Sequence, residues 1–299
     1  MQFSLIIPHH NSSSSLERLL QSVNNIHNME IIIVDDNSNK DELKKLEYLK
    51  LEYKFILLLN EGKTAGGARN TGIKYAHGKW LIFADADDYF TQDLPELLNY
   101  VNIYPDSDII YFDVTSSISE TGERANRDKH IKQLFTLWRS NLDERYMRCK
   151  YLVPWGKIYK KDFILSNDIK FDECIAGNDM WFAVRSGVEA KHISIIEKEI
   201  YVCTISTGSI TTTLSQDRHE AKFQATLKTN DYLKKHKYNK FQISVLYFIA
   251  GALQFGFKYL LHVLNECRIH RSNLFIGTRK LLHIKEVLED RQNPKFIKK

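Results

Sequence analysis

The stretch KWLIFADADDYF, residues 79–90, decides how the rest of this sequence is interpreted. The apolar run at residues 80–84 predicts a short buried strand. Three carboxylates follow within four residues, at Asp85, Asp87 and Asp88. Carboxylates this close together repel one another unless a cation lies among them, and hard oxygen ligands suit Mg²⁺ or Mn²⁺. The alternative is a solvated acidic turn that caps the next helix.

The composition indicates a globular protein of one large domain or two. The chain has 299 residues, of which 43% are hydrophobic, so it can bury a sizeable core. The net charge of +5 is mild, and no recognised nucleic-acid-binding module accompanies it, so we expect no nucleic-acid partner. The four cysteines include no CxxC pair, which argues against a zinc site and a disulfide framework and fits a reducing compartment. Met1 leads directly into a predicted strand without an export signal, so we expect a cytoplasmic protein.

Strand and helix patterns alternate over the first 115 residues. The predicted strands are residues 3–8, 29–34, 55–59 and 80–84, and the stretches between them have helical character. This alternation predicts an α/β fold with a mostly parallel, doubly wound sheet, in which ligands bind beyond the carboxyl ends of the strands. Polar side chains collect at those ends, and one cleft would gather them: His9, His10, Asn11, Asp35, Asp36, Asp85, Asp87 and Asp88.

Four motifs in this order and spacing resemble glycosyltransferase family two, the inverting nucleotide-sugar transferases of the GT-A fold. They are IIPHHN, IIIVDDNS, GGARNTGI and LIFADADD. The resemblance is specific over residues 3–95, weaker to about residue 212 and absent beyond. It implies a GT-A catalytic domain over 1–214, with a nucleotide-sugar-binding half (1–115) and an acceptor half (116–214), followed by a helical region (215–299).

The resemblance implies donor-binding roles for residues that follow the first two strands. Pro8, His10 and Asn11 stand where relatives line the nucleotide pocket, and the flat ring of His10 could stack on uracil. One carboxylate of Asp35 and Asp36 would accept the uracil N3–H, which would give preference for a uridine donor. The other is expected to form a turn or a helix cap.

The glycine-containing motif and the acidic motif extend the implied donor site. Gly66 allows close backbone approach at a helix N-terminus, and Arg69 is placed to meet the donor diphosphate or to pair with the acidic cluster. Asp85 is expected to support the sugar or ribose, Asp87 to contact ribose or metal, and Asp88 to bind the metal. The chain lacks the spacing of a P-loop or of a dinucleotide-binding loop, which excludes those sites.

Two later segments are expected to supply the acceptor side. The segment VPWGKIYKKDFI resembles a W-x-K-[LI]-[YF] element of bacterial members of the family. Trp155 could stack on a sugar ring or belong to the core, and Lys157 could reach the donor phosphates. In the segment 201–213, which closes this domain in relatives, Ser209 could contact phosphate.

Asp179 matches the general base of the family, an aspartate that usually follows a glutamate. Asn178 replaces that glutamate here, which implies a different acceptor hydroxyl or a weaker hold on the acceptor. Trp181 is expected on the same acceptor side. As an alternative, Asp179 could simply cap the helix that follows it.

The C-terminal region differs in character from the rest of the chain. Residues 241–257 form an uncharged run of 17 residues, interrupted by Gln242 and Gln254. Its helical spacing favours one helix packed on the catalytic domain or on a second subunit of a homo-oligomer, rather than a membrane span. The basic and aromatic tail predicts peripheral contact with anionic lipid at the inner face of the membrane, or else a solvated basic surface.

Together, the residues and the resemblance imply a metal-dependent inverting glycosyltransferase. It would move a hexose or N-acetylhexosamine from a UDP-sugar to a hydroxyl of a glycan or glycoconjugate, in bacterial surface polysaccharide or glycoprotein synthesis. One alternative is a non-catalytic scaffold protein built on the helical C-terminal part. Another is a sugar nucleotidyltransferase, which would need a glycine-rich signature after the first strand, where this chain has Pro-His-His-Asn.

Overall fold

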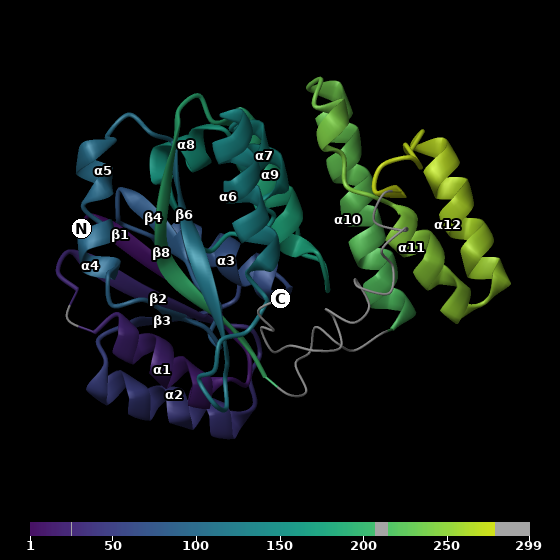
Figure 1. The fold of residues 1–299 in the computed structure, drawn as a ribbon. Coiled ribbons are helices and arrows are strands. Elements are labelled where there is room, and N and C mark those ends of the chain that lie inside the picture. Colours follow the sequence, from purple (N-terminus) through teal and green to yellow (C-terminus); the bar gives the residue numbers. More distant parts are fainter. Residues whose placement is uncertain (25, 207–214, 279–299) are drawn as a thin grey trace.

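The computed structural model describes residues 1–24, 26–206 and 215–278, and within them eight strands form one mixed sheet (Figure 1). Its strand order is β3-β2-β1-β4-β7-β6-β8-β5. The strands are β1 (Phe3–His9), β2 (Met29–Asp35), β3 (Ile56–Leu59), β4 (Trp80–Phe83), β5 (Tyr89–Phe90), β6 (Ile109–Ile118), β7 (Lys157–Lys160) and β8 (Ile193–Ile205). The helices that precede residue 206 are α1 (Ser13–Ser22), α2 (Lys40–Glu52), α3 (Thr64–Tyr75), α4 (Leu94–Leu97), α5 (Tyr100–Ile103), α6 (Lys129–Asn141), α7 (Arg145–Lys150), α8 (Lys161–Ser166) and α9 (Asn178–Glu189).

The first half of the sheet is parallel, as the βα alternation predicts. β2 pairs with β1 and β3, and β1 pairs with β4, all in parallel register. The apolar centre of β1, from Leu5 to Ile7, is fully buried because helices cover both faces of the sheet. α1 and α2 contact each other, and α3 packs on β1, β2 and β3. The right-handed rule for parallel crossovers puts α3 on the face opposite α1 and α2. The carboxyl ends of β1, β2 and β4 therefore meet at one edge.

The second half contains the antiparallel strand β7, which lies between β4 and β6. β8 runs parallel to β6, and β5 is a two-residue antiparallel edge strand on β8. The polar segment 116–127 forms a hairpin, closed by an antiparallel bridge between Ser117 and Arg124. Between β5 and β6 the chain forms two short helices, α4 and α5.

An aromatic cluster fills the core between β4, β7 and α9. The ring of Phe83 makes edge contacts with Tyr159, Phe171 and Phe182, at centroid distances of 5.6, 5.2 and 5.4 Å. Phe171 and Phe182 stack face to face with centroids 3.8 Å apart. Because Phe83 ends β4 and Phe182 lies in the first turns of α9, this cluster fixes α9 against the carboxyl edge of the sheet.

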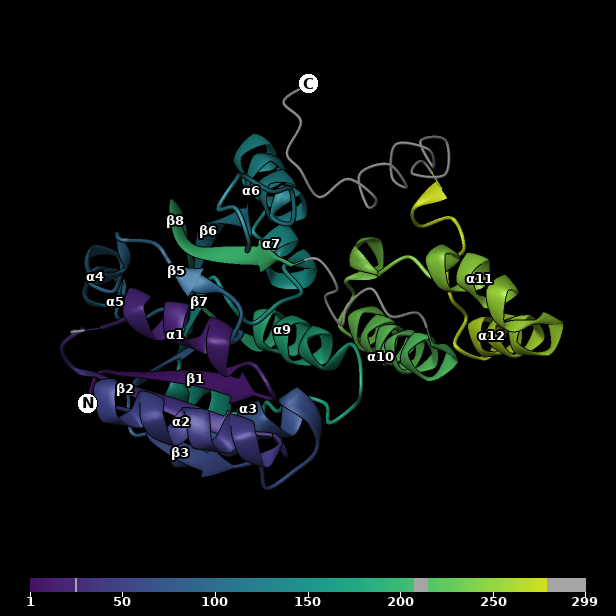
Figure 2. The ribbon, with the colours of Figure 1, turned by 90° about the horizontal axis from the view of Figure 1, so that it is seen from below.

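The C-terminal helices form a separate small core beside α9 (Figures 1 and 2). They are α10 (Gln216–Lys235), η2 (Asn239–Phe241), α11 (Leu246–Ala252), η3 (Leu253–Phe255) and α12 (Phe257–Ile269). One continuous helix over 241–257 was the wrong expectation. The chain turns at Gly256, whose φ of +98° suits glycine, so that α12 folds back on α11. The predicted domain boundary at residue 214 lies outside the described residues and stays a prediction.

A membrane span does not fit the described helices, because none is long and apolar enough to cross a bilayer. The apolar residues of 241–257 that are buried pack instead on α10, where Val245, Phe248 and Ala252 contact the cluster around Phe223. The helical spacing of the apolar residues therefore does indicate a packed helix face, as expected. That face packs within the unit formed by α10, α11 and α12.

The aromatic cluster provides a test of the core. Phe182→Ala should lower the free energy of unfolding by about 3–5 kcal/mol, because a fully buried ring and its stacking partners are lost. Phe257→Ala is the matched control, since that ring is exposed and its removal opens no cavity. Urea denaturation of both variants measures the difference, and equal losses would contradict this description of the core.

Candidate functional site

A cavity of about 470 Å³ opens at the carboxyl ends of the parallel strands. Eight predicted site residues line it: Pro8, His10, Asp36, Arg69, Asp85, Asp87, Asn178 and Asp179. His9, Ser12, Ala65, Ala86, Arg127 and Ser206 complete the lining. Segments far apart in the chain therefore converge here, as the strand-end argument predicts. The other predicted residues lie outside this lining, and Ser209 lies outside the described residues.

Arg69 connects the two sides of the cavity. It projects from α3, and its guanidinium bonds the Asp179 carboxylate at 2.8 Å and the Asp85 carboxylate at 2.5 Å. Only 4% of its side chain is exposed, and it lies 5.4 Å from the ring centre of Phe171. A buried guanidinium with two carboxylate partners is held in one orientation, so it fixes Asp85 relative to Asp179. Of the two roles expected for Arg69, the structure displays the pairing with the acidic residues.

Asp179 stands at the start of α9, where 28% of its side chain is exposed to the cavity. Burial raises the pKa of Asp179 above its ordinary value, and the charge of Arg69 opposes that shift. The nearby charge of Asp85 raises the pKa further. A carboxylate that is ionised yet partly desolvated can accept a proton from a hydroxyl held in the cavity.

The acidic loop gathers three carboxylates, as the sequence predicts. One oxygen from each of Asp85, Asp87 and Asp88 lies within 4.8 Å of the others. Burial, followed by repulsion from neighbouring carboxylates, raises the pKa of Asp87 and raises that of Asp88 well above its ordinary value. Hard oxygen donors that repel one another at this spacing fit a divalent cation such as Mg²⁺ or Mn²⁺.

The three carboxylates are not equivalent in position. Asp85 and Asp87 line the cavity, whereas Asp88 is fully buried behind them. Asp88 accepts hydrogen bonds from the Tyr201 hydroxyl at 2.9 Å and from the Thr204 backbone N–H at 2.7 Å. It therefore ties the acidic loop to β8, and a metal-binding role for Asp88 would add to this anchoring role.

Arg127 is a cavity residue that the sequence did not indicate. It lies in the hairpin segment before α6 and donates a hydrogen bond to the Thr204 carbonyl at 2.5 Å. Its positive charge lowers the pKa of Asp87 and Asp88, against the effect of their burial. Only the β6–β8 pairing brings this arginine to the acidic loop, so a local sequence pattern cannot reveal it.

The two carboxylates after β2 have separate roles in the structure. Asp35 is buried, bonds His9 at 3.0 Å and accepts the Ser38 backbone N–H at 3.1 Å. Asp36 lines the cavity, and one of its oxygens accepts a hydrogen bond from Asn60 at 2.7 Å. Asp35 thus forms the expected turn, and Asp36 is the carboxylate available to a ligand.

Two neighbouring residues after β1, His10 and Asn11, also have separate roles in the structure. The His10 ring lies at the cavity and bonds the Asp36 carbonyl at 2.7 Å, which orients the ring. Asn11 adopts a left-handed conformation, with φ of +49°, and its side chain accepts the Asn39 backbone N–H at 2.9 Å. Asn11 therefore holds the loops after β1 and β2 together, and its contact with the donor stays a prediction.

Gly66 and Lys157 occupy structural positions rather than the donor-facing positions expected for them. A Cβ at Gly66 would lie 2.0 Å from the Asp172 carbonyl, so glycine is needed where α3 meets that segment. Lys157 is buried, and its ammonium donates to the Tyr151 carbonyl at 2.7 Å. Burial lowers the pKa of Lys157 well below its ordinary value. The Lys157 side chain therefore points into the core, where its ammonium lies against the rings of Tyr111 and Tyr151.

The two tryptophans expected on the acceptor side pack against protein. Trp155 is buried and stacks on Tyr201 with ring centres 5.2 Å apart, which favours its alternative role as a core residue. Trp181 is half-buried against α10, with the Lys228 ammonium 4.1 Å from its ring centre. An acceptor role for Trp181 stays a prediction.

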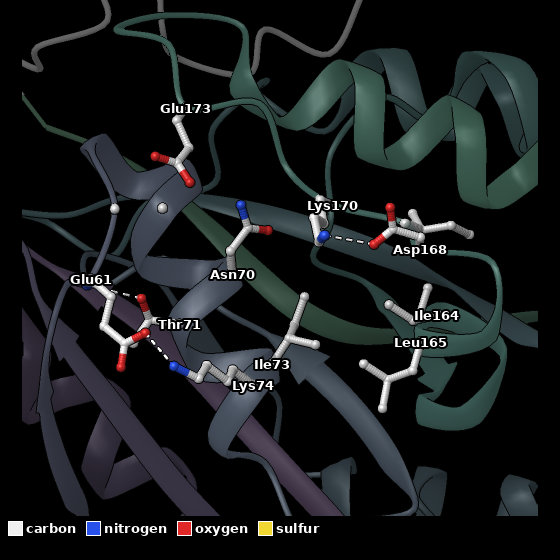
Figure 3. Close-up of a pocket in the computed structure, with 13 residues that line it drawn as sticks. Glu61, Asn70, Thr71, Ile73, Lys74, Ile164, Leu165, Asp168, Lys170 and Glu173 are labelled. Carbon is white, nitrogen blue, oxygen red and sulfur yellow. Dashed lines mark hydrogen bonds and ion pairs between the residues drawn. The ribbon is translucent and has the colours of Figure 1, made fainter.

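A second cavity, of about 600 Å³, lies between α3 and the segment that follows β7 (Figure 3). Four of its five charged side chains pair with one another, Glu61 with Lys74 and Asp168 with Lys170, each at 2.6 Å. The fifth, Glu173, accepts the Lys63 backbone N–H at 2.9 Å. The residues predicted for donor, acceptor or metal lie elsewhere. The cavity at the strand ends is therefore the candidate site.

The Arg69 bridge can be tested through stability. Arg69→Met should lower the free energy of unfolding by about 3 kcal/mol at neutral pH, because two carboxylates lose their buried partner. The deficit should shrink at acidic pH, since protonated carboxyls no longer need that charge. Arg139→Met is the control, because its pair with Glu197 is exposed and should change stability little. Urea titrations at both pH values would contradict the account if the two variants behaved alike.

Comparison with known proteins points to one family. Residues 4–165 match the sequence model of glycosyl transferase family 2. The putative glycosyltransferase EpsH of Bacillus subtilis is 26% identical over 219 residues, which cover 69% of this chain and 62% of that protein. Poly(ribitol-phosphate) beta-N-acetylglucosaminyltransferase TarS of Staphylococcus aureus is 27% identical over 209 residues, which cover 67% of this chain and 35% of that protein. The matches thus span less than two thirds of these two relatives.

A longer match and a solved structure agree with this result. The cholesterol galactosyltransferase of Borreliella burgdorferi is 25% identical over 278 residues, covering 83% of this chain and 74% of that protein. The crystal structure of S. aureus TarS residues 1–349 with UDP-GlcNAc has a TM-score of 0.63 and 22% identity, and the match covers 89% of this chain and 72% of that one. The expected GT-A fold is thereby confirmed. Because the family model matches more than half of its residues, the chain belongs to glycosyl transferase family 2.

Proposed function

We propose that this chain is a metal-dependent inverting glycosyltransferase that moves a hexose or N-acetylhexosamine from a UDP-sugar to a hydroxyl of a glycan or glycoconjugate. One observation carries the proposal: a single cavity holds a partly desolvated carboxylate, Asp179, and an acidic pair, Asp85 and Asp87, on either side of Arg69. A displacement reaction of this kind needs a base on one side of the sugar and charge stabilisation on the other.

The nucleotide would lie against the loops after β1 and β2. His10 offers a flat ring for stacking on the base. Asn60 bonds only one carboxylate oxygen of Asp36, so the other oxygen can accept the uracil N3–H. A structure of the relative TarS contains UDP-GlcNAc, and another contains UDP, which supports a UDP-sugar as donor here. In this assignment Asp36, and not Asp35, selects uridine.

The diphosphate would lie at the acidic loop. Asp87 and Asp85 face the cavity and would hold a divalent cation, with Asp88 behind them. When bound, Mn²⁺ or Mg²⁺ supplies positive charge that stabilises the departing diphosphate. Arg127 adds a second positive charge on the same side of the cavity. The Arg69 guanidinium keeps Asp85 turned toward this region.

Asp179 would act as the general base. It accepts the proton of the acceptor hydroxyl while that oxygen forms its bond to the anomeric carbon. The bond from that carbon to the diphosphate oxygen breaks, and UDP leaves with the electron pair. One displacement inverts the anomeric centre, so an α-linked donor gives a β-linked product. No second carboxylate is needed as a nucleophile, and holding both substrates in line supplies much of the rate.

The acceptor would approach beside the start of α9. Asn178 lines the cavity next to Asp179, and its amide can both donate and accept a hydrogen bond, which the glutamate usual in the family cannot do when ionised. The named acceptors of relatives include poly(ribitol-phosphate) and cholesterol, so fold alone does not select one. We propose a role in bacterial surface polysaccharide or glycoprotein synthesis at the cytoplasmic face of the membrane, and homo-oligomer formation through the C-terminal helices stays a prediction.

Asp179→Asn separates catalysis from donor binding. Release of UDP from the donor should fall at least about 10²-fold, because the amide cannot take the acceptor proton, while affinity for UDP stays the same. In the parent enzyme the acid limb of kcat/KM should lie above the ordinary aspartate pKa, since burial raises the pKa of Asp179 and the base acts only when ionised. Asp168→Asn, in the second cavity, is the control. Undiminished turnover by Asp179→Asn would show that Asp179 is not the general base.

Calorimetric titration of UDP tests the donor and the metal together. With Mn²⁺ present the parent protein should bind UDP, and chelation of the metal or Asp87→Ala should weaken binding at least about tenfold, because the diphosphate loses its partner charge. Asp88→Ala should weaken binding and also lower stability, since it removes the bonds to Tyr201 and Thr204. Binding of GDP but not UDP would overturn the role of Asp36. If the folded protein bound no nucleotide, the proposal of an enzyme would be overturned in favour of a scaffold protein.

A further inference from the structure

Helix α12 exposes an apolar stripe on the side opposite its core contacts. Its inner side chains, Tyr259, Val263 and Cys267, follow one another every four residues and pack with α10 and α11. On the opposite side Phe257, Leu261 and Leu264 are 72, 50 and 40% exposed. Their spacing of four and three residues puts them on one helical face. Figures 1 and 2 place α12 at the end of the molecule, away from the sheet.

Positive charge accompanies this stripe. Arg268 continues it by one turn, and Lys258 is exposed beside Phe257. The charge also divides sharply along the chain: residues 1–214 contain 25 Lys and Arg against 30 Asp and Glu, whereas residues 215–299 contain 17 against 7. The apolar stripe thus belongs to the basic part of an otherwise slightly acidic protein.

We propose that the α12 face, defined as Phe257, Leu261, Leu264 and Arg268, docks this protein on an anionic lipid surface. Exposed Phe and Leu side chains insert at the boundary between headgroups and acyl chains, and neighbouring Lys and Arg side chains attract anionic headgroups. A second copy of the chain fits less well, because an isologous contact would bring the same positive charges together. The proposed contact is peripheral, through one face of α12.

The α12 face is joined to the candidate active site through α10. Helix α10 packs along α9, and Lys228 of α10 pairs with Asp172 at 2.6 Å. Arg218, at the start of α10, donates to the Ile175 carbonyl at 3.3 Å, just before Asn178 and Asp179. A protein docked through α12 is thereby held at the surface by the same unit that supports the acceptor side of the cavity. The docking itself does not depend on the proposed reaction.

Vesicle co-sedimentation of the full chain tests this proposal. The parent protein should bind phosphatidylcholine vesicles that contain phosphatidylglycerol, more weakly as salt rises, and should not bind phosphatidylcholine alone. The double variant Phe257→Ser/Leu261→Ser should bind at least about tenfold more weakly, because two inserting side chains are lost. A variant of two exposed apolar residues on α2, Tyr48→Ser/Leu51→Ser, is the matched control and should bind as the parent does. Far-UV circular dichroism and urea denaturation of all three proteins check that they are folded, whether or not they bind UDP.

Three outcomes would overturn the proposal. Equal vesicle binding by the parent and the α12 variant would place the contact outside this face, and removal of residues 279–299 would then show whether it lies there. Failure of the parent to bind the anionic vesicles would exclude lipid docking. A parent that self-associates in light scattering, with loss of association in the α12 variant, would make the face an interface between copies of the chain.

Discussion

The ion pairs of Arg69 are the constraint on which the candidate active site depends. One guanidinium on α3 holds a carboxylate from the end of β4 and another from the start of α9, which are 94 residues apart in sequence. This contact is short because α3 approaches the segment before α9 at Gly66, where a side chain would collide with the Asp172 carbonyl. The role of the glycine is therefore to bring Arg69 within reach of Asp179. Burial strengthens both pairs and makes the loss of any member costly.

The acidic loop shows how repulsion is tolerated near a site. Asp85, Asp87 and Asp88 raise one another's energy when ionised, and burial adds to the cost for Asp87 and Asp88. The fold offsets this with Arg69 and Arg127 on the cavity side, and with the Tyr201 hydroxyl and the Thr204 N–H behind Asp88. These contacts stabilise the acidic loop, and a bound divalent cation would stabilise it further by reducing the repulsion between the carboxylates.

The sequence predicted the parts of the structure that local patterns encode. Continuous apolar runs located β1, β2 and β4, and the strand-end argument placed Asp36, Asp85 and Asp87 in one cavity. Asp179 was identified only through the family resemblance, because it begins a helix and follows no strand. The run at 241–257 is not one helix, because residues 242–245 lie outside helices and the chain turns again at Gly256, with φ of +98°. The separate roles of Asp35 and Asp36 could not be assigned from sequence. The two residues are chemically identical neighbours, and only the folded chain gives them different hydrogen-bond partners.

Residues whose roles depend on distant pairing were the hardest to predict. Lys157 resembled a phosphate ligand by motif, but its strand lies inside the sheet, and its ammonium is enclosed by Tyr111 and Tyr151. Arg127 showed the reverse case, because a charge in an unremarkable hairpin reaches the acidic loop through β6 and β8. In both residues the sheet order, and not the neighbouring sequence, decides what the charge contacts.

The most direct test of the account is a crystal structure of this protein with UDP and Mn²⁺, with the metal located by its anomalous scattering. We expect one metal peak between the diphosphate and the carboxylates of Asp85 and Asp87, with uracil against His10 and Asp36 and with Asp179 open to the acceptor side. Nucleotide bound in the second cavity between α3 and residues 164–173, or bound at the strand ends with Asp36 far from the base, would contradict it.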